Sequence, residues 1–181
     1  MDNTIHIIYD DRQSEDYGRL LGEFIEQGID HYRFWNCIIN SKSVVESINA
    51  SHKTIVNWAK DHNKPYCIIA EQDVKFTSPT AWKYFLDNTP KTFDLYLSCT
   101  YARPFEDKNI CGFHLYIVHQ KFYDEFLSIP NDVHIDTYIS SLKKDYHFCY
   151  PFPALQREGF SANNHAIVNY NTLLNPEDIY K

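Results

Sequence analysis

Residues 65–76 constrain the fold of this chain more than any other segment. Four apolar residues, Cys67-Ile68-Ile69-Ala70, run directly into the polar residues Glu71-Gln72-Asp73. A short, continuous apolar run predicts a strand covered on both faces, as in a parallel sheet. The acids then lie at the carboxyl end of the strand, which is the edge where open α/β sheets bind ligands. Two carboxylates placed there can hold a divalent cation that bridges phosphates, and the alternative is that both are solvated turn acids.

The other predicted elements alternate along the chain, which is typical of an α/β fold. Apolar runs predict strands at 5–9, 31–39, 93–100, 110–119 and 147–153. Apolar residues at helical spacing predict helices within 14–29, 43–62, 78–90, 120–129 and 131–144. We expect a break in the helix at 43–62, where Asn49-Ala50-Ser51 interrupts it and Ser51 restarts it as an N-cap. The strand at 110–119 is expected to run antiparallel to its neighbours, near the site.

Length and charge limit the kind of protein this can be. With 181 residues, we expect a single domain over 1–181, with 171–181 as a mobile tail. The net charge is −7 and no basic block occurs, which argues against nucleic-acid binding. Only five glycines are present, and no Gly-rich phosphate loop is among the motifs. A phosphate-bearing ligand would therefore need a metal or a few local cations to offset repulsion.

The cysteines and the hydropathy indicate a reducing compartment. Five cysteines occur without any CxxC pair, an odd count with no disulfide framework. We find no signal-peptide pattern at the N-terminus, and no apolar stretch approaches the ~20 residues of a membrane span. We therefore expect a cytoplasmic protein.

Two sets of residues on predicted helices have both a structural and a functional interpretation. His52 falls near the middle of the apolar face of its helix. It is either a core histidine bonded to a backbone carbonyl or a ligand contact from a helix under the site. His134 and Asp136 are either a metal or acid/base pair, or acids at a helix N-terminus that complement the helix dipole.

Several motifs follow one another in an order that is known from one enzyme family. They cover about residues 4–170, and they are Ile5 to Arg12 (IHIIYDDR), Trp35-Asn36-Cys37, Ala50-Ser51-His52 with Trp58, 68–74 (IIAEQDV), 112–117 (GFHLYI), 130–136 and 156–161 (QREGFS). Together these motifs resemble the family 25 glycosyltransferases of the lipopolysaccharide-biosynthesis type. The resemblance implies a GT-A-like α/β fold with a mostly parallel central sheet and helices on both faces. It also implies transfer of a sugar from a nucleotide-sugar donor to a saccharide or lipid-linked saccharide acceptor, in surface polysaccharide or lipopolysaccharide synthesis.

Motif position assigns roles to individual residues. The residues expected to contact the nucleotide-sugar donor are Asp10, Arg12, Ser51, His52, Glu71, Gln72, Gln156 and Ser161. A divalent metal, Mn²⁺ or Mg²⁺, is expected on Asp73, with Glu71 and His165 as further candidate ligands. A base must deprotonate the acceptor hydroxyl in a direct displacement, and the candidates are Asp136 first and His114 second.

Two departures from the family pattern keep other functions open. Gln72 stands where the family has the middle acid of its acidic motif, and Ala162 stands where an acid usually follows Ser161. These changes favour an alternative, a catalytically inactive nucleotide-sugar or carbohydrate binding module on the same fold. A nucleotidyltransferase is a third reading, because it also uses paired acids to hold a metal.

Overall fold

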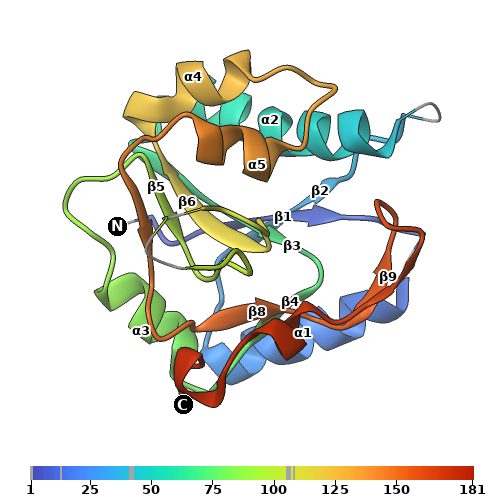
Figure 1. The fold of residues 1–181 in the computed structure, drawn as a ribbon, viewed down its shortest axis with the longest axis vertical. Helices are drawn as coiled ribbons and strands as arrows, with labels where there is room; N and C mark the ends of the chain where they lie inside the picture. The colour runs from blue at the N-terminus through green and yellow to red at the C-terminus, as the bar shows by residue number, and fades with distance from the viewer. Residues whose placement is uncertain (1, 13, 41–42, 105–106, 108) are drawn as a thin grey trace.

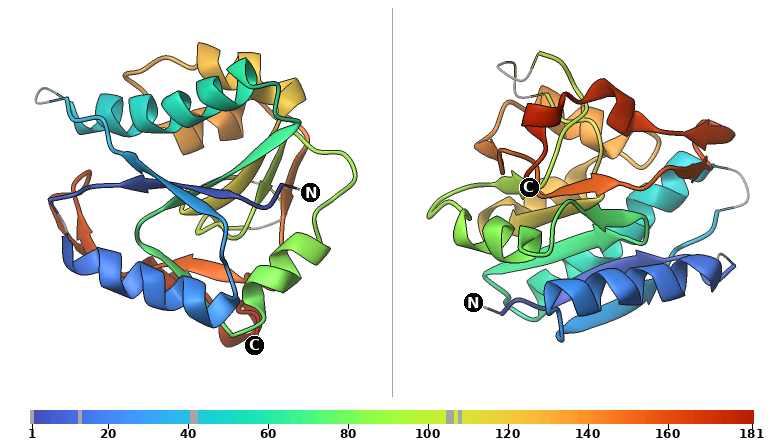
Figure 2. Two further views of the ribbon diagram at one scale, coloured as in Figure 1. Left: turned by 180° about the vertical axis from the view of Figure 1, so that it is seen from behind. Right: turned by 90° about the horizontal axis from the view of Figure 1, so that it is seen from below.

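The computed structural model describes residues 2–12, 14–40, 43–104, 107 and 109–181, and it shows a sheet between two layers of helices (Figure 1). Helices α2, α4 and α5 cover one face of the central sheet. Helices α1 and α3 lie on the other side, together with a small second sheet of β4 and β8 (Figures 1 and 2). The predicted α/β architecture, a mostly parallel central sheet with helices on both faces, is confirmed.

The central sheet has six strands in the order β2-β1-β3-β6-β5-β7. Their bounds are β1 Ile5–Tyr9, β2 Tyr32–Asn36, β3 Tyr66–Glu71, β5 Leu95–Leu97, β6 Leu115–His119 and β7 Tyr146–Phe148. β1 is parallel to β2 and β3, and β5 is parallel to β7. β6 runs antiparallel to both β3 and β5, as expected for this segment. The carboxyl ends of β1, β2 and β3 therefore meet at one edge of the sheet.

The helices begin and end at residues suited to those positions. Their bounds are α1 Ser14–Gln27, α2 Val44–Asp61, α3 Ala81–Asp87, α4 Tyr123–Ser128 and α5 Ile135–Ser141. α1 ends at Gly28, whose φ of +65° suits glycine, and the Ile29 N–H then donates to the Phe24 carbonyl at 2.8 Å. α2 begins at Ser43, whose hydroxyl accepts from the Glu46 N–H at 3.2 Å.

The expected break in α2 is wrong, because the helix is continuous through Ser51. The Ser51 hydroxyl donates to the Ser47 carbonyl at 2.8 Å, one helical turn back, and accepts from the Ile38 N–H at 2.8 Å. This polar side chain therefore finds its partners within the helix and in the loop after β2, so it has no need to end the helix.

Side chains alternate between the two faces of each strand, which divides the core into two clusters and sets the direction of the polar side chains. In β3, Ile68 and Ala70 pack into the cluster beside α1 and α3, whereas Cys67 and Ile69 pack into the cluster beneath α2 and α4. Glu71 continues the second set, so its side chain points toward α2. In β6, Tyr116 also faces α2, and it lies opposite Ile69 in the ladder. Because side chains alternate along both strands, Glu71 and Tyr116 lie on the same face of the central sheet.

The C-terminal part of the chain contains short elements that the sequence pattern does not reveal. They are β8 Ala154–Gln156 paired with β4 Val74–Phe76, β9 Gly159–Ser161 paired with β10 Ala166–Val168, and the 3-10 helices η3 Tyr170–Leu173 and η4 Pro176–Asp178. A short 3-10 turn, η2 Gln120–Phe122, also precedes α4. In the segment 171–181, Tyr180 stacks on Tyr84 at 4.0 Å between ring centroids, and Ile179 forms a parallel bridge with Phe152.

Candidate functional site

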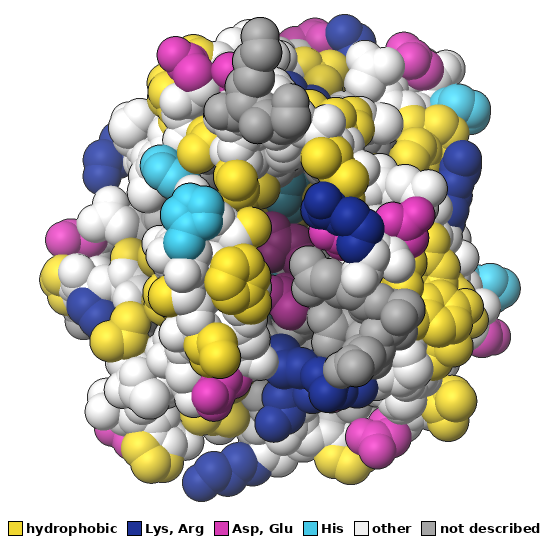
Figure 3. All heavy atoms as spheres, turned by 90° about the vertical axis from the view of Figure 1, so that its right-hand side faces the viewer, with side chains coloured by type: hydrophobic (Ala, Val, Ile, Leu, Met, Phe, Trp, Pro, Cys, Tyr) yellow, Lys and Arg dark blue, Asp and Glu magenta, His cyan; other side chains and the backbone are white. Residues whose placement is uncertain are grey.

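A cleft opens at the carboxyl ends of β1, β2 and β3, and it has two lobes that share a wall. The larger lobe has a volume of about 520 Å³ and the smaller lobe about 160 Å³. Both lobes are lined by Ile48, His52, Glu71, Gln156, Ser161 and Asn163. Only the larger lobe is lined by Asp10, Arg12, Ser51, Gln72, Asp73 and His165, and only the smaller lobe by Tyr101, His134, Asp136 and Tyr170. Figure 3 shows acidic side chains in the hollow of this face, with hydrophobic side chains around its mouth.

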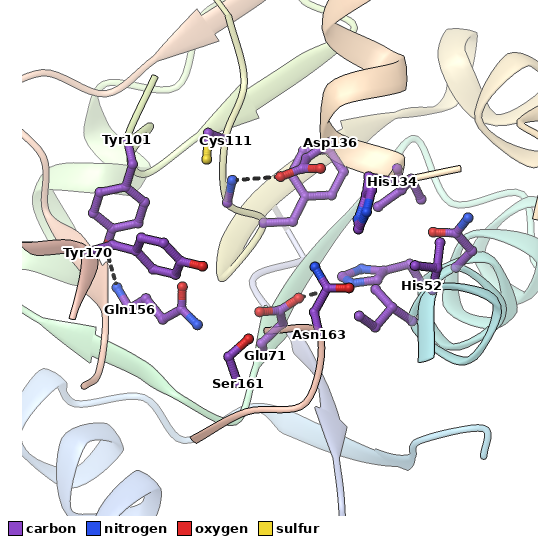
Figure 4. A pocket seen from close by; sticks show the side chains of 16 residues that line it. His52, Glu71, Tyr101, Cys111, His134, Asp136, Gln156, Ser161, Asn163 and Tyr170 are labelled. Atoms are coloured by element: carbon purple, nitrogen blue, oxygen red, sulfur yellow. Dashed lines mark hydrogen bonds and ion pairs between the residues drawn. The ribbon is translucent and has the colours of Figure 1, made fainter. Parts of the chain in front are cut away.

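Glu71, His52 and Tyr116 form a hydrogen-bonded chain behind the shared wall. His52 is 1% exposed, and its Nε2 lies 3.1 Å from Glu71 Oε1 (Figure 4). Its Nδ1 lies 2.7 Å from the Tyr116 hydroxyl. Burial raises the pKa of Tyr116 well above its ordinary value, so this hydroxyl keeps its proton and donates to Nδ1. Nε2 then carries the ring proton and donates to the Glu71 carboxylate. The interpretation of His52 as a core histidine bonded to a backbone carbonyl is therefore wrong.

This chain of bonds keeps Glu71 ionised. Burial pushes the pKa of Glu71 upward, but the hydrogen bond from His52 and the electrostatic influence of the nearby His52 and His114 rings outweigh it and lower the pKa below its ordinary value. The Glu71 side chain is 29% exposed to the cleft. Among the described residues, Oε2 of Glu71 has no hydrogen-bond partner, so it can accept a bond from a ligand.

Asp73 and Gln156 join the larger lobe to the C-terminal segment. The Gln156 Nε2 donates to Asp73 Oδ2 at 2.9 Å, and the Arg157 N–H donates to the Asp73 carbonyl at 2.7 Å. The Gln156 N–H donates to the Tyr101 hydroxyl, which in turn donates to Asn171 Oδ1. These bonds fix Gln156 beside the carboxylate of Asp73.

Asp10, Arg12 and Gln72 line the larger lobe together. Arg12 clamps the Asp10 carboxylate with Nε on Oδ1 at 2.8 Å and Nη2 on Oδ2 at 2.6 Å, which raises the pKa of Arg12. The Gln72 Oε1 accepts from the Asp10 N–H at 2.7 Å. Gln72 therefore serves to tie the end of β1 to the turn after β3, and its neutral side chain adds no third charge beside Asp10 and Asp73.

The smaller lobe contains Asp136 on the first turn of α5. Its Oδ2 accepts from the Gly112 N–H at 3.0 Å (Figure 4). Its Oδ1 accepts from the Thr137 N–H at 2.8 Å. The loop before α5 is held by Asn49 of α2, which is 1% exposed. Its amide nitrogen donates to the carbonyls of Pro130, Asn131 and Val133 at 3.2, 2.9 and 2.7 Å.

The cleft brings together nearly all of the site residues that the sequence predicts, with His114 as the exception. His114 is 1% exposed and lines neither lobe, and its Nε2 lies 3.1 Å from the Ala154 carbonyl. Burial lowers its pKa, so it stays neutral inside the core. It is placed too deep to meet an acceptor hydroxyl. Ser51 lines the larger lobe, but both its bonds go to backbone groups, so it shapes the loop after β2.

Residues that sequence reasoning missed also line the cleft. They are Ile38, Ile39, Asn49, Phe160, Asn163 and Tyr170. Most lie in irregular loops or in the short β9–β10 hairpin, where no periodic pattern marks them. The sequence predicts a helix break at Asn49. Its burial on the cleft side of α2 follows from the continuity of the helix.

The donor set for a divalent cation is partial. In the part of the chain that the structure describes, no group of at least three His, Cys, Asp or Glu side chains lies together in a way that could hold a metal ion. Asp73 lines the larger lobe with one carboxylate, and His165 lines the same lobe. Mg²⁺ is commonly held by one or two carboxylates together with substrate phosphates. Asp73 fits that kind of site, in which the ligand supplies the remaining oxygens.

The comparisons with known proteins agree with this architecture. No protein-family model and no curated protein sequence matches the chain. The fold is similar to a glycosyltransferase involved in the glycosylation of the major capsid of PBCV-1, with a TM-score of 0.50 and 10% sequence identity over 80% of each chain. This similarity shows that the chain shares the fold of that glycosyltransferase, and it agrees with the GT-A-like fold that the sequence resemblance implies.

Two solved structures of one further protein match the fold with lower TM-scores. The catalytic domain of Drosophila beta1,4galactosyltransferase 7 in complex with xylobiose matches with a TM-score of 0.47 and 10% identity. A mutant of that enzyme in complex with manganese, UDP-Gal and xylobiose matches with a TM-score of 0.45 and 11% identity. Each match covers 81% of this chain and 63% of the Drosophila chain. No described helix of the present chain is both long and apolar enough to cross a membrane.

Proposed function

We propose that this protein is a glycosyltransferase that moves a sugar from a nucleotide-sugar donor to a saccharide acceptor. The observation that carries the proposal is the two-lobed cleft at the ligand-binding edge of a GT-A-like sheet. The larger lobe has the volume of a small-molecule site and takes the donor. The smaller lobe takes the acceptor, and the shared wall at Glu71 and Gln156 is where the two substrates meet.

The charges of the larger lobe support a donor held with a cation. Glu71 and Asp73 line this lobe as carboxylates, and the third carboxylate, Asp10, is paired with Arg12. A diphosphate would meet net negative charge there unless a divalent cation came with it. Asp73 would hold that cation, with Glu71 and His165 as further candidates. When bound, the cation supplies charge neutralisation for the departing diphosphate.

The other donor contacts follow from their place in the lobe. Arg12 presents a guanidinium toward the lobe while it pairs with Asp10. Gln72 and Ser51 fix the backbone around the donor through the bonds described above, and His52 sets the orientation of Glu71. Glu71 accepts a hydrogen bond from the donor through its second oxygen.

Asp136 is the proposed base for the acceptor hydroxyl. It lines the smaller lobe, and two backbone N–H groups fix its carboxylate in one orientation. Each oxygen keeps a further lone pair, which can accept the proton as the new bond forms. Ser161 and Gln156, which line both lobes, would close over the donor and the acceptor.

The finer assignment rests on the sequence resemblance. The order of the motifs along the chain supports membership of glycosyltransferase family 25 and a role in lipopolysaccharide or other surface polysaccharide synthesis. A lipid-linked saccharide acceptor, a cytoplasmic location and action at the surface of the inner membrane belong to the same proposal.

A catalytically inactive binding module is the second candidate function. The observation in its favour is that Gln72 replaces an acid and spends its side-chain oxygen on the Asp10 N–H. Such a module would bind a nucleoside diphosphate without metal dependence and without turnover.

Thermal unfolding with UDP, CDP, GDP and ADP, each with and without Mn²⁺, tests the proposal. A ligand at 100 times its Kd adds about 2.7 kcal/mol to the unfolding free energy. For a chain of this size that raises the midpoint by roughly 5–10 °C. We expect one diphosphate to give a metal-dependent shift that Asp73→Asn removes and the surface control Asp87→Asn keeps.

Release of the diphosphate from the matching nucleotide sugar, with a panel of saccharide acceptors, then tests catalysis. Asp136→Asn should abolish acceptor-dependent release, whereas Asp132→Asn in the preceding loop should not. No shift with any diphosphate would contradict the transferase proposal. Full transfer activity in both Asp73→Asn and Asp136→Asn would contradict the assigned roles. A shift independent of metal, with no turnover, would favour the binding module.

A further inference from the structure

Large apolar side chains stand exposed at the mouth of the larger lobe. Ile38, Ile39 and Phe160 all line this lobe, and they are 41%, 55% and 65% exposed. Single exposed apolar residues are ordinary on protein surfaces, but a group gathered around one cavity marks a contact surface. These side chains come from two separate segments, the loop after β2 and the β9–β10 hairpin.

The β9–β10 hairpin holds Phe160 outside the hydrophobic core. β9 and β10 form a sheet of two strands, and Phe160 lies opposite Ile167, which is 73% exposed. Figure 1 shows the hairpin beyond the carboxyl end of β1, and residues 160–163 and 165 of the hairpin line the larger lobe. Among the described residues, the Phe160 ring belongs to no core cluster and stacks on no other ring, so it is available to a ligand in the lobe.

The two lobes of the cleft indicate which part of a nucleotide-sugar donor would contact Ile38, Ile39 and Phe160. The sugar must lie at the shared wall, because only there can it meet an acceptor in the smaller lobe. Ile38, Ile39 and Phe160 line the larger lobe and not the smaller one. In the proposed function the diphosphate is held beside Asp73, which leaves the apolar side chains of the larger lobe for the nucleoside.

We propose that Phe160, together with Ile38 and Ile39, forms the site for the planar base of the donor nucleotide. This inference rests on the proposed function, since it assumes that the larger lobe takes a nucleotide sugar. The flat face of a base stacks on an aromatic ring and packs against aliphatic side chains. Every base has such a face, so the contribution of Phe160 is similar for pyrimidines and purines, and any choice between them is made by other groups.

Binding measured by calorimetry on Phe160→Ala tests the site, with UDP, CDP, GDP, ADP and inorganic pyrophosphate as probes. Loss of a base–aromatic stack weakens binding by about five-fold or more. We expect that loss for the diphosphate that binds the unchanged protein, little change for pyrophosphate, and retained affinity in Phe160→Trp. Ile167→Ala, the partner across the same hairpin, is the matched control and should bind as before.

The outcomes separate this inference from the proposed function. Equal affinity of Phe160→Ala and the unchanged protein for the nucleoside diphosphate would overturn the base site and leave the transferase proposal standing. Equal weakening by Phe160→Ala and Ile167→Ala would also overturn it, because the effect would then belong to the hairpin fold. Failure of the unchanged protein to bind any nucleoside diphosphate would overturn both. Since Phe160 is exposed, the unfolding midpoint of the free variants should match that of the unchanged protein.

Discussion

Replacement of Tyr116 by Phe isolates one hydrogen bond behind the cleft. The Tyr116 side chain is fully buried and its ring stacks on Phe113 at 4.4 Å between centroids, so Phe keeps the packing and removes only the hydroxyl. What remains is the Nδ1 of His52, an acceptor that is buried and has lost its donor. Leaving a buried acceptor unsatisfied costs about 1–3 kcal/mol. For a domain of this size each kcal/mol lowers the midpoint by roughly 2–4 °C.

Urea unfolding at neutral pH measures this loss, and Tyr96→Phe is the matched control. Tyr96 is a buried tyrosine on the neighbouring strand, but among the described residues its hydroxyl has no partner stronger than the Cys149 thiol. A thiol is a weak partner, so Tyr96→Phe should change the unfolding free energy much less than Tyr116→Phe. If both variants lost the same stability, or if Tyr116→Phe lost none, the assignment of the His52 proton to Nε2 by a Tyr116 donor would be refuted.

The remaining predictions concern the charges and clamps around the site. Glu71→Gln should lose stability relative to the unchanged protein at neutral pH. Since the folded-state pKa of Glu71 is lowered, the stability that its charge adds is present above the unfolded pKa of ~4.3 and is lost as the pH falls through the folded pKa. The unfolding free energies of Glu71→Gln and the unchanged protein should therefore converge in acid. Asn49→Ala should cost about 1–3 kcal/mol in urea unfolding, because it leaves backbone carbonyls without a donor; equal stability would contradict the clamp. Asp178→Asn should cost about 1.5–3 kcal/mol, because it weakens the charged bond from Arg103 at 2.7 Å; a variant as stable as Asp87→Asn would contradict this.

The sequence predicts the fold well where elements are long or continuous. The run before Glu71 predicts β3, its burial on both faces and the edge at which the acids lie. The helical spacing predicts α1 and α2, with Gly28 as the stop of α1. These signals hold because burial of one helix stripe or of both strand faces fixes the composition of every residue involved.

The sequence fails where tertiary partners decide the outcome. β8, β9 and β10 have three residues each, too few for a periodic pattern, and each exists because of its partner strand. His52 looks like a core residue because its partners, Glu71 and Tyr116, are remote in sequence. Spacing alone likewise cannot tell that His114 turns into the core while Asp136, on a helix start, reaches the cleft.

The pairing of β4 with β8 has a consequence for how the protein matures. β1 finds both of its partner strands, β2 and β3, within the first 71 residues, so these three strands can pair early in synthesis. Asp73 gains Gln156 only when β8 arrives, and Gln156 is in turn held by Asn171. A nascent chain still held by the ribosome at residue 150 would therefore have an ordered scaffold and an open, incomplete cleft. Vectorial synthesis thus delays substrate recognition until nearly the whole chain has emerged.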